Sequence, residues 1–111
     1  MIALMMIAAH MAGDFLFQTQ WIAENKMKNP LVLWLHCYIY TLCFIPVTVY
    51  AHYHQGLEYV YGFIMAIFAT HMLIDWRKWA SGRYWTPKPI LVDQTLHAIT
   101  LAFLAYLFFN P

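Results

Sequence analysis

Seven histidine and aspartate residues interrupt the apolar segments of this sequence, and their types and spacing are those of metal ligands. They are His10, Asp14, His36, His71, Asp75, Asp93 and His97. Imidazole nitrogen and carboxylate oxygen together bind divalent ions such as zinc, manganese and iron. In three places a histidine and an aspartate are four residues apart, which puts both side chains on one face of a helix. The pattern therefore predicts stripes of metal ligands on several helices.

The composition indicates that these helices cross a membrane. Of the 111 residues, 63% are hydrophobic and only 10% are charged, and the mean hydropathy is +0.56. We predict an all-α fold, a polytopic membrane four-helix bundle made of two helical hairpins. A single transmembrane domain, 1–111, would contain helices at about 2–22, 30–52, 58–80 and 87–109, each near the ~20 residues that span a bilayer. Asn29 and Pro30 suit an N-cap and a first helical position, and Pro46 should kink the second helix.

The basic residues predict the orientation of the chain. Lys26 and Lys28 lie in the first connection, and Arg77, Lys78, Arg83 and Lys88 lie at or in the third. The second connection and both chain ends contain no Lys or Arg. By the positive-inside rule, connections one and three face the cytoplasm and both termini lie on the outer side. The lipid bilayer is thus the expected partner, and a net charge of +1 gives no indication of nucleic-acid binding.

The polar residues also form an internal repeat. His10 and Asp14 recur 61 positions later as His71 and Asp75, and His36 recurs at the same offset as His97. Two hairpins inserted in the same direction would be related by a pseudo-two-fold axis along the membrane normal. Counted along the helices, the aspartates lie nearer the cytoplasm and the histidines one turn, ~6 Å, deeper. All seven residues therefore fall at one depth, and Gly13 would allow the close helix approach that such a cluster requires.

The energetic cost of burying these residues favours bound ions. A charged Asp in mid-helix costs roughly 2.5 to 3.5 kcal/mol on insertion scales, so three of them need compensation. Seven mixed nitrogen and oxygen ligands suit two divalent ions, with one Asp bridging. Asp14, Asp75 and Asp93 are then the expected catalytic carboxylates. A hydrogen-bonded structural His–Asp pair is the alternative interpretation for any single pair.

Several polar residues border the predicted cluster and are candidates for substrate binding. They are Gln18, Lys26 and Gln94. The leading functional hypothesis is a dinuclear metal-dependent hydrolase that acts on a phosphoester, of a lipid or a membrane-associated metabolite, at the cytoplasmic membrane interface. One alternative is a metal-ion or proton transport or channel subunit. Another is a small structural interaction subunit with a metal or polar core. Assembly into a homo-oligomer is left open.

The motifs also resemble a known family. The run "AHMAGDFLFQTQWIAENK", Leu35 with His36, then "HMLIDWRK" and "DQTLH" is similar to the small membrane family catalogued as domain of unknown function 3307. The resemblance covers almost the whole chain and implies a membrane protein of bacteria and their phages. Together with the distribution of Lys and Arg, this predicts a location in the bacterial inner membrane with periplasmic termini. The resemblance supports the expected helices and polar residues and implies no activity.

Overall fold

The structure is all-α, as predicted. The computed structural model describes residues 2–26, 28–54, 56–76 and 87–109, and no β-strand occurs in these ranges. The side chains of 87–93 lie outside this description. The elements are α1 (Ile2–Met11), a π-helical turn η1 (Ala12–Leu16), α2 (Gln20–Asn25), α3 (Pro30–Cys43), α4 (Ile45–His54), α5 (Val60–Asp75) and α6 (Pro87–Phe109).

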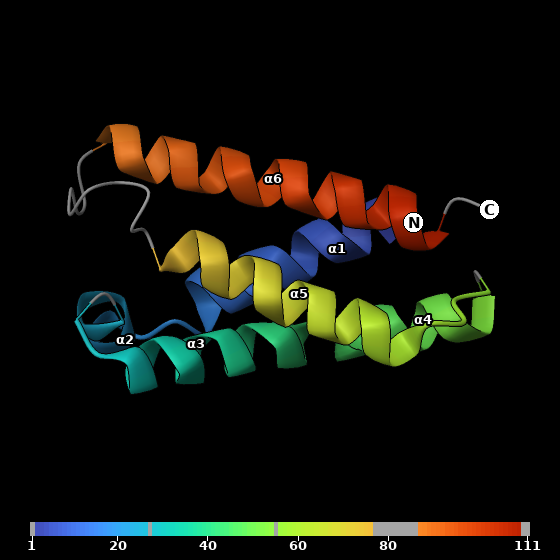
Figure 1. Ribbon diagram of the computed structural model, residues 1–111, viewed down its shortest axis with the longest axis horizontal. Coiled ribbons are helices and arrows are strands. Elements are labelled where there is room, and N and C mark those ends of the chain that lie inside the picture. Colours follow the sequence, from blue (N-terminus) through green and yellow to red (C-terminus); the bar gives the residue numbers. More distant parts are fainter. Residues whose placement is uncertain (1, 27, 55, 77–86, 110–111) are drawn as a thin grey trace.

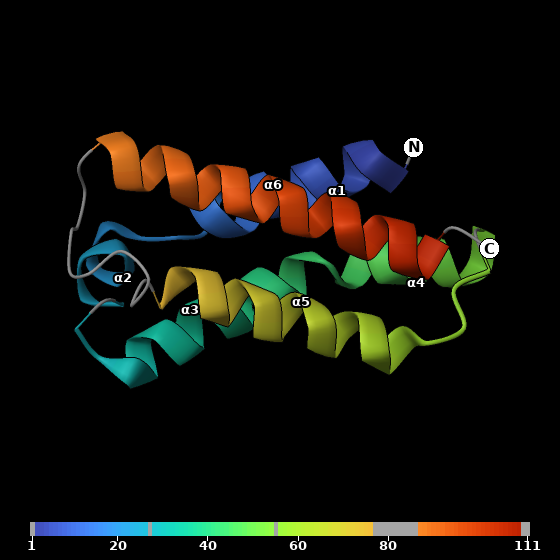
Figure 2. The same cartoon turned by 45° about the horizontal axis from the view of Figure 1, so that its top comes forward.

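The helices lie side by side along the long axis of a molecule that measures 40 × 22 × 20 Å. The start of α1, the end of α4 and the end of α6 lie at one end of this axis, and α2 lies at the opposite end (Figures 1 and 2). The chain thus runs back and forth along the axis. Helix α5 packs against both α3 and α6, so it lies at the centre of the tertiary contacts.

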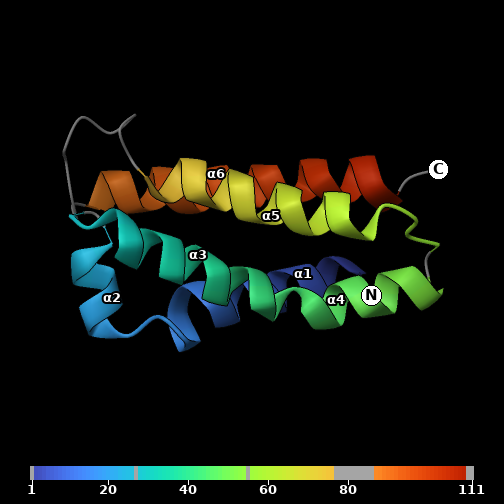
Figure 3. The same cartoon turned by 60° about the horizontal axis from the view of Figure 1, so that its bottom comes forward.

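The helix that begins at Pro30 follows the local chemistry of its sequence. The Asn29 side chain accepts a hydrogen bond from the Leu31 amide at 3.0 Å, and Pro30 occupies the first helical position, as expected. The helix is interrupted at Phe44, where α3 ends and α4 begins in almost the same direction (Figure 3). Pro46 explains this interruption, because it has no amide hydrogen and its ring crowds the carbonyl one turn earlier.

The expected first helix, 2–22, differs from the structure. Helix α1 passes into the π-helical turn η1, in which the Phe17 amide donates to the Ala12 carbonyl at 2.8 Å. The chain then leaves the helix, and α2 begins after Thr19, whose hydroxyl accepts from the Ile22 amide at 3.2 Å. Gly13 weakens the regular helix here and Thr19 caps a new one. Because π-helical turns occur frequently at functional sites, Asp14 within η1 is a candidate functional residue.

Apolar and polar side chains separate along the molecule. An apolar core includes Met6, Phe44, Phe63 and Leu104. The buried polar residues of the described chain are His10, Asp14, Lys26, His36, Thr41, Thr48, His71, Asp75 and His97. Many large apolar side chains remain on the outside, among them Leu31, which is 79% exposed. The buried interior is therefore unusually polar, while the exterior is rich in apolar surface.

One helix of the described chain is long and apolar enough to cross a membrane. It is the stretch Pro30–His54, which comprises α3 and α4 and has a mean hydropathy of 1.7, although the core helix of a soluble protein has the same properties. Shorter apolar helices cover Ile2–Leu16, Val60–Asp75 and Gln94–Phe109. Length and composition thus agree with a membrane location for one helix.

Gly13 lies where η1 packs closely against α3, as its small size suggested. A Cβ added there would lie 2.6 Å from Tyr40 Cδ2 and 3.0 Å from the Tyr40 Cα atom. We expect Gly13→Ala to lower the free energy of unfolding by about 1–3 kcal/mol, because the backbone must shift. Thermal unfolding in detergent measures this effect.

Gly62→Ala is the matched control for this prediction. Gly62 lies in α5, and its added Cβ would meet only ordinary contacts of 3.6 Å or more. This variant should be more stable by roughly 0.5–1 kcal/mol, because alanine favours helix. If both variants were equally stable, close packing at Gly13 would not matter.

Candidate metal centre

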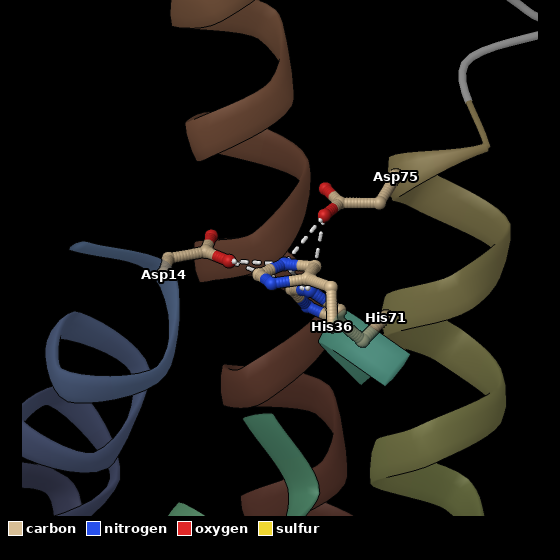
Figure 4. A group of neighbouring side chains, drawn as sticks. All are labelled: Asp14, His36, His71 and Asp75. Carbon is tan, nitrogen blue, oxygen red and sulfur yellow. Dashed lines mark hydrogen bonds and ion pairs between the residues drawn. The ribbon is translucent and has the colours of Figure 1, made fainter. Parts of the chain in front are cut away.

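Four buried side chains from two helices and one π-helical turn converge inside the molecule. Asp14 comes from η1, His36 from α3, and His71 and Asp75 from α5. Figure 4 shows the two imidazole rings between the two carboxylates. One ligand atom of each residue lies within 4.8 Å of the others. We call this set the four-residue group.

Five of the six distances between the ligand atoms are close to those of a tetrahedral site. His36 Nε2 lies 3.2 Å from Asp14 Oδ1 and 2.9 Å from Asp75 Oδ2. His71 Nε2 lies 3.4 Å from the same Asp14 oxygen, 3.1 Å from the same Asp75 oxygen and 3.0 Å from His36 Nε2. Tetrahedral zinc bonds of about 2.0–2.1 Å would place ligand atoms about 3.3–3.4 Å apart. The two imidazoles and their contacts to each carboxylate therefore have nearly the spacing of ligands of one ion.

Protons alone satisfy this group poorly. Each Nε2 atom carries at most one hydrogen, yet each faces the other nitrogen and two carboxylate oxygens. If both nitrogens donate to carboxylates, their hydrogens face each other across 3.0 Å. His71 Nδ1 is buried without a hydrogen-bond partner, so this ring lacks the second hydrogen bond that usually orients a metal-binding histidine. A cation among the four atoms would remove the conflict.

A second group shares Asp14 and extends the site. His10 Nε2 and His97 Nε2 lie 3.9 and 3.7 Å from Asp14 Oδ2, the oxygen that the four-residue group leaves free. Asp75 is divided similarly, because its Oδ1 lies 3.2 Å from His97 Nε2. Asp14 thus presents one oxygen to each group, whereas Asp75 presents its second oxygen to His97 alone. Asp14 would therefore be the residue suited to bridge two ions.

The contacts also follow the internal repeat of the sequence. His36 Nε2 lies 3.2 Å from Asp14 Oδ1, and the residues 61 positions later repeat this distance, since His97 Nε2 lies 3.2 Å from Asp75 Oδ1. The equivalence is incomplete within helices: His71 is 3.1 Å from Asp75, whereas His10 is 3.9 Å from Asp14. The wider π-turn around Asp14 accounts for the longer distance.

Lys26 lies within the candidate metal centre as a buried cation. Its Nζ atom lies 2.9 Å from Asp75 Oδ2, and the residue is only 4% exposed. Gln18 Oε1 accepts a second hydrogen bond from the same ammonium at 2.8 Å. Both residues border the cluster, as expected, but Lys26 is an internal counter-ion rather than a surface charge. The sequence did not predict this burial, because no helical periodicity of the residues indicates that the chain folds back through α2 and places Lys26 inside the cluster.

Gln94 and Tyr40 orient His10. Gln94 Oε1 lies 3.0 Å from His10 Nε2, and Gln94 Nε2 donates to Asp14 Oδ2 at 3.5 Å. Tyr40 Oη lies 2.8 Å from His10 Nδ1, and the Tyr40 ring stacks on His71 with centroids 3.6 Å apart. A hydroxyl on the second nitrogen fixes the ring of a metal-binding histidine. Tyr40 thus joins the predicted residues as a supporting one, signalled by its position four residues after His36.

The structure brings six of the seven predicted ligands together. These are His10, Asp14, His36, His71, Asp75 and His97. Asp93 lies in α6, but its side chain is outside the described part of the chain. The same holds for the Lys88 side chain and for Arg77, Lys78 and Arg83, on which the predicted orientation depends. The buried clusters could hold metal ions, and the identity of the ions stays a prediction.

Comparison with known proteins gives one result. A family model with the description "Protein of unknown function (DUF3307)" matches residues 2–111, which confirms the resemblance found in the motifs. The comparisons with curated proteins and with solved structures find no match. The family description states no activity, so the chemistry has to be inferred from the site.

Proposed function

Because the chain belongs to the protein family of unknown function DUF3307, whose description carries no activity, we propose a function from the candidate metal centre. The protein is a membrane-embedded, dinuclear metal-dependent hydrolase that cleaves a phosphoester at the cytoplasmic membrane interface. The observation that carries this proposal is the convergence of His36, His71, Asp14 and Asp75, with Asp14 shared by the second group.

The distribution of polar and apolar side chains supports the membrane location. Asp75 and His36 are almost fully buried, whereas Leu73 is 62% and Phe103 is 58% exposed on the outside. Large exposed apolar surfaces are rare on proteins in water. Helices in lipid, in contrast, expose apolar side chains and direct their polar residues inward. We accordingly propose a polytopic four-helix bundle of two hairpins in the bacterial inner membrane, with α2 on the cytoplasmic side and both termini on the periplasmic side.

The donor set decides which ions are suitable. His36 and His71 with one oxygen each from Asp14 and Asp75 would hold the first ion, for which zinc is the best match because it favours tetrahedral nitrogen and oxygen sites. His10, His97 and the second Asp14 oxygen would hold the other ion. Manganese and iron bind the same donor types with more ligands, so they remain alternatives to zinc.

The residues around the ions would prepare the site for hydrolysis. Two bound ions supply Lewis-acid activation of water and of a phosphoryl oxygen. Tyr40 fixes the ring of His10, and Lys26 holds Asp75 on the side facing Gln18. The Gln94 amide lies between His10 and Asp14 at the edge of the cluster, where it can donate to a bound phosphate. Asp14 and Asp75, with Asp93, remain the proposed catalytic carboxylates.

Transport and a purely structural role are the competing functions. A route across the membrane needs polar groups along its whole length. The described core at the other end of the molecule is apolar and includes Phe44, Val47, Phe63 and Leu104. The Lys26–Asp75 ion pair is the observation that favours a structural role, because it stabilises a polar core without metal.

Hydrolysis by the purified protein tests the proposal. We expect the zinc- or manganese-loaded protein in liposomes to hydrolyse members of a phosphoester panel, and His36→Gln to reduce the rate at least a hundredfold. His54→Gln is the matched control, because His54 is exposed and lies outside both groups. Hydrolysis that survives His36→Gln, or metal or proton flux without hydrolysis, would contradict the enzyme.

A further inference from the structure

An apolar groove leads from the outside of the molecule to the candidate metal centre. It lies between α1 and α6, has a volume of about 340 Å³, and is lined by Met6, Ala98 and Ala102 among others. Its polar residues are His10 and Gln94. The volume falls within the ~300–1,000 Å³ of typical ligand pockets.

Small side chains create this groove. Helices α1 and α6 lie side by side (Figures 1 and 2), and alanines at 3, 98, 102 and 105 leave the space between them unfilled. Met6, which is 2% exposed, lies on its inner side, whereas Ala98 and Ala102 are exposed. The groove is therefore open toward the surroundings of the helices, so a ligand can enter laterally.

The polar end of the groove is directly connected to the metal-binding residues. His10 Nε2 and Gln94 Oε1 are 3.0 Å apart, and Gln94 Nε2 reaches Asp14 Oδ2. From this end, the lining runs seven residues along α1 to Ala3 and eleven along α6 to Ala105, or roughly 10 and 16 Å at 1.5 Å per residue. A ligand that fits both parts is long and apolar, with one polar end.

We propose that the substrate is a single-chain lipid phosphate whose hydrocarbon chain lies in this groove and whose phosphate lies beside His10 and Gln94. This inference rests on the proposed hydrolase function and specifies its substrate class. Each methylene buried in the groove can improve affinity by up to about fourfold. A short phosphoester would lack this contribution, although it could still reach the ions.

A photoreactive probe tests the binding of the chain separately from catalysis. The probe is dodecylphosphonate with a diazirine at the end of its chain, which has no phosphoester bond to hydrolyse. In phosphatidylcholine vesicles, we expect it to label the zinc-loaded protein at the α1 and α6 residues that line the groove. Ala102→Phe should reduce this labelling at least tenfold, because the ring fills the groove.

The matched control is Ala69→Phe, since Ala69 is an exposed alanine of α5 outside the groove, and its labelling should be unchanged. Even labelling of all outward-facing helices, or labelling that resists Ala102→Phe, would overturn the proposal. So would a dimer that excludes the probe and dissociates in Ala102→Phe, because a second chain would then fill the groove. Groove labelling without hydrolysis would refute only the hydrolase, and hydrolysis of short esters without labelling would refute only the lipid substrate.

Discussion

Asp14→Asn is expected to weaken metal binding by far more than the ~10–100-fold that loss of an outer-shell partner causes, and to abolish hydrolysis. Asp14 is the residue common to both groups, with Oδ1 facing His36 and Oδ2 facing His97. The amide keeps the shape of the side chain but removes the negative charge that holds two ions together. Because a neutral amide is easier to bury than an unpaired carboxylate, the helices should still form.

Elemental analysis measures the metal content of purified Asp14→Asn, and circular dichroism measures its helix content. Glu24→Gln is the matched control, because it removes one carboxylate from an exposed position on α2, outside both groups. Its metal content should equal that of the parent. An Asp14→Asn protein with full metal content would show that Asp14 is not a bridging ligand.

Asp75→Asn should have a larger effect on stability, because it also removes a partner of a buried cation. Lys26 Nζ is 2.9 Å from Asp75 Oδ2, and these side chains are 4% and 0% exposed. Breaking a buried ion pair by neutralising one member costs about 3–5 kcal/mol. The variant should therefore unfold at a lower temperature than Asp14→Asn, in addition to losing metal.

The double variant Asp75→Asn/Lys26→Met separates stability from metal binding. Methionine keeps an apolar stem in the space of Lys26, and replacement of both members of a buried pair is often close to neutral. The unfolding temperature of the double variant should thus recover most of the decrease seen in Asp75→Asn, whereas the double variant should still bind no metal. Lys28→Met, at an exposed position, controls for the loss of a charge and should change stability by less than about 0.5 kcal/mol. A double variant that regains metal would show that Asp75 is not a ligand.

The shared helix faces of the histidines and aspartates could be predicted because they depend on helix geometry. A spacing of four residues placed His71 and Asp75 on one face, and the offset of 61 residues matched the His97–Asp75 contact to the His36–Asp14 contact. The break near Pro46 and the cap at Asn29 followed from equally local rules. These features require no knowledge of how distant segments meet.

Features that depend on tertiary contacts could not be predicted in the same way. The π-turn around Asp14 forms where Gly13 meets Tyr40, a residue of another helix. Lys26 looked like a basic loop residue, and only the fold of α2 against α3 brings its ammonium to Asp75. The groove likewise depends on which alanines of α1 and α6 face each other. Helical periodicity alone does not specify these contacts between segments.

The number of metal ions bound per chain tests the central claim most directly. The purified protein is loaded with zinc, manganese or iron, freed from excess ion by gel filtration, and analysed for metal and protein. Two groups of ligands that share Asp14 predict two ions per chain for at least one of these metals. A chain that retains none of them would contradict the metal centre and leave the buried His–Asp–Lys network as a structural core.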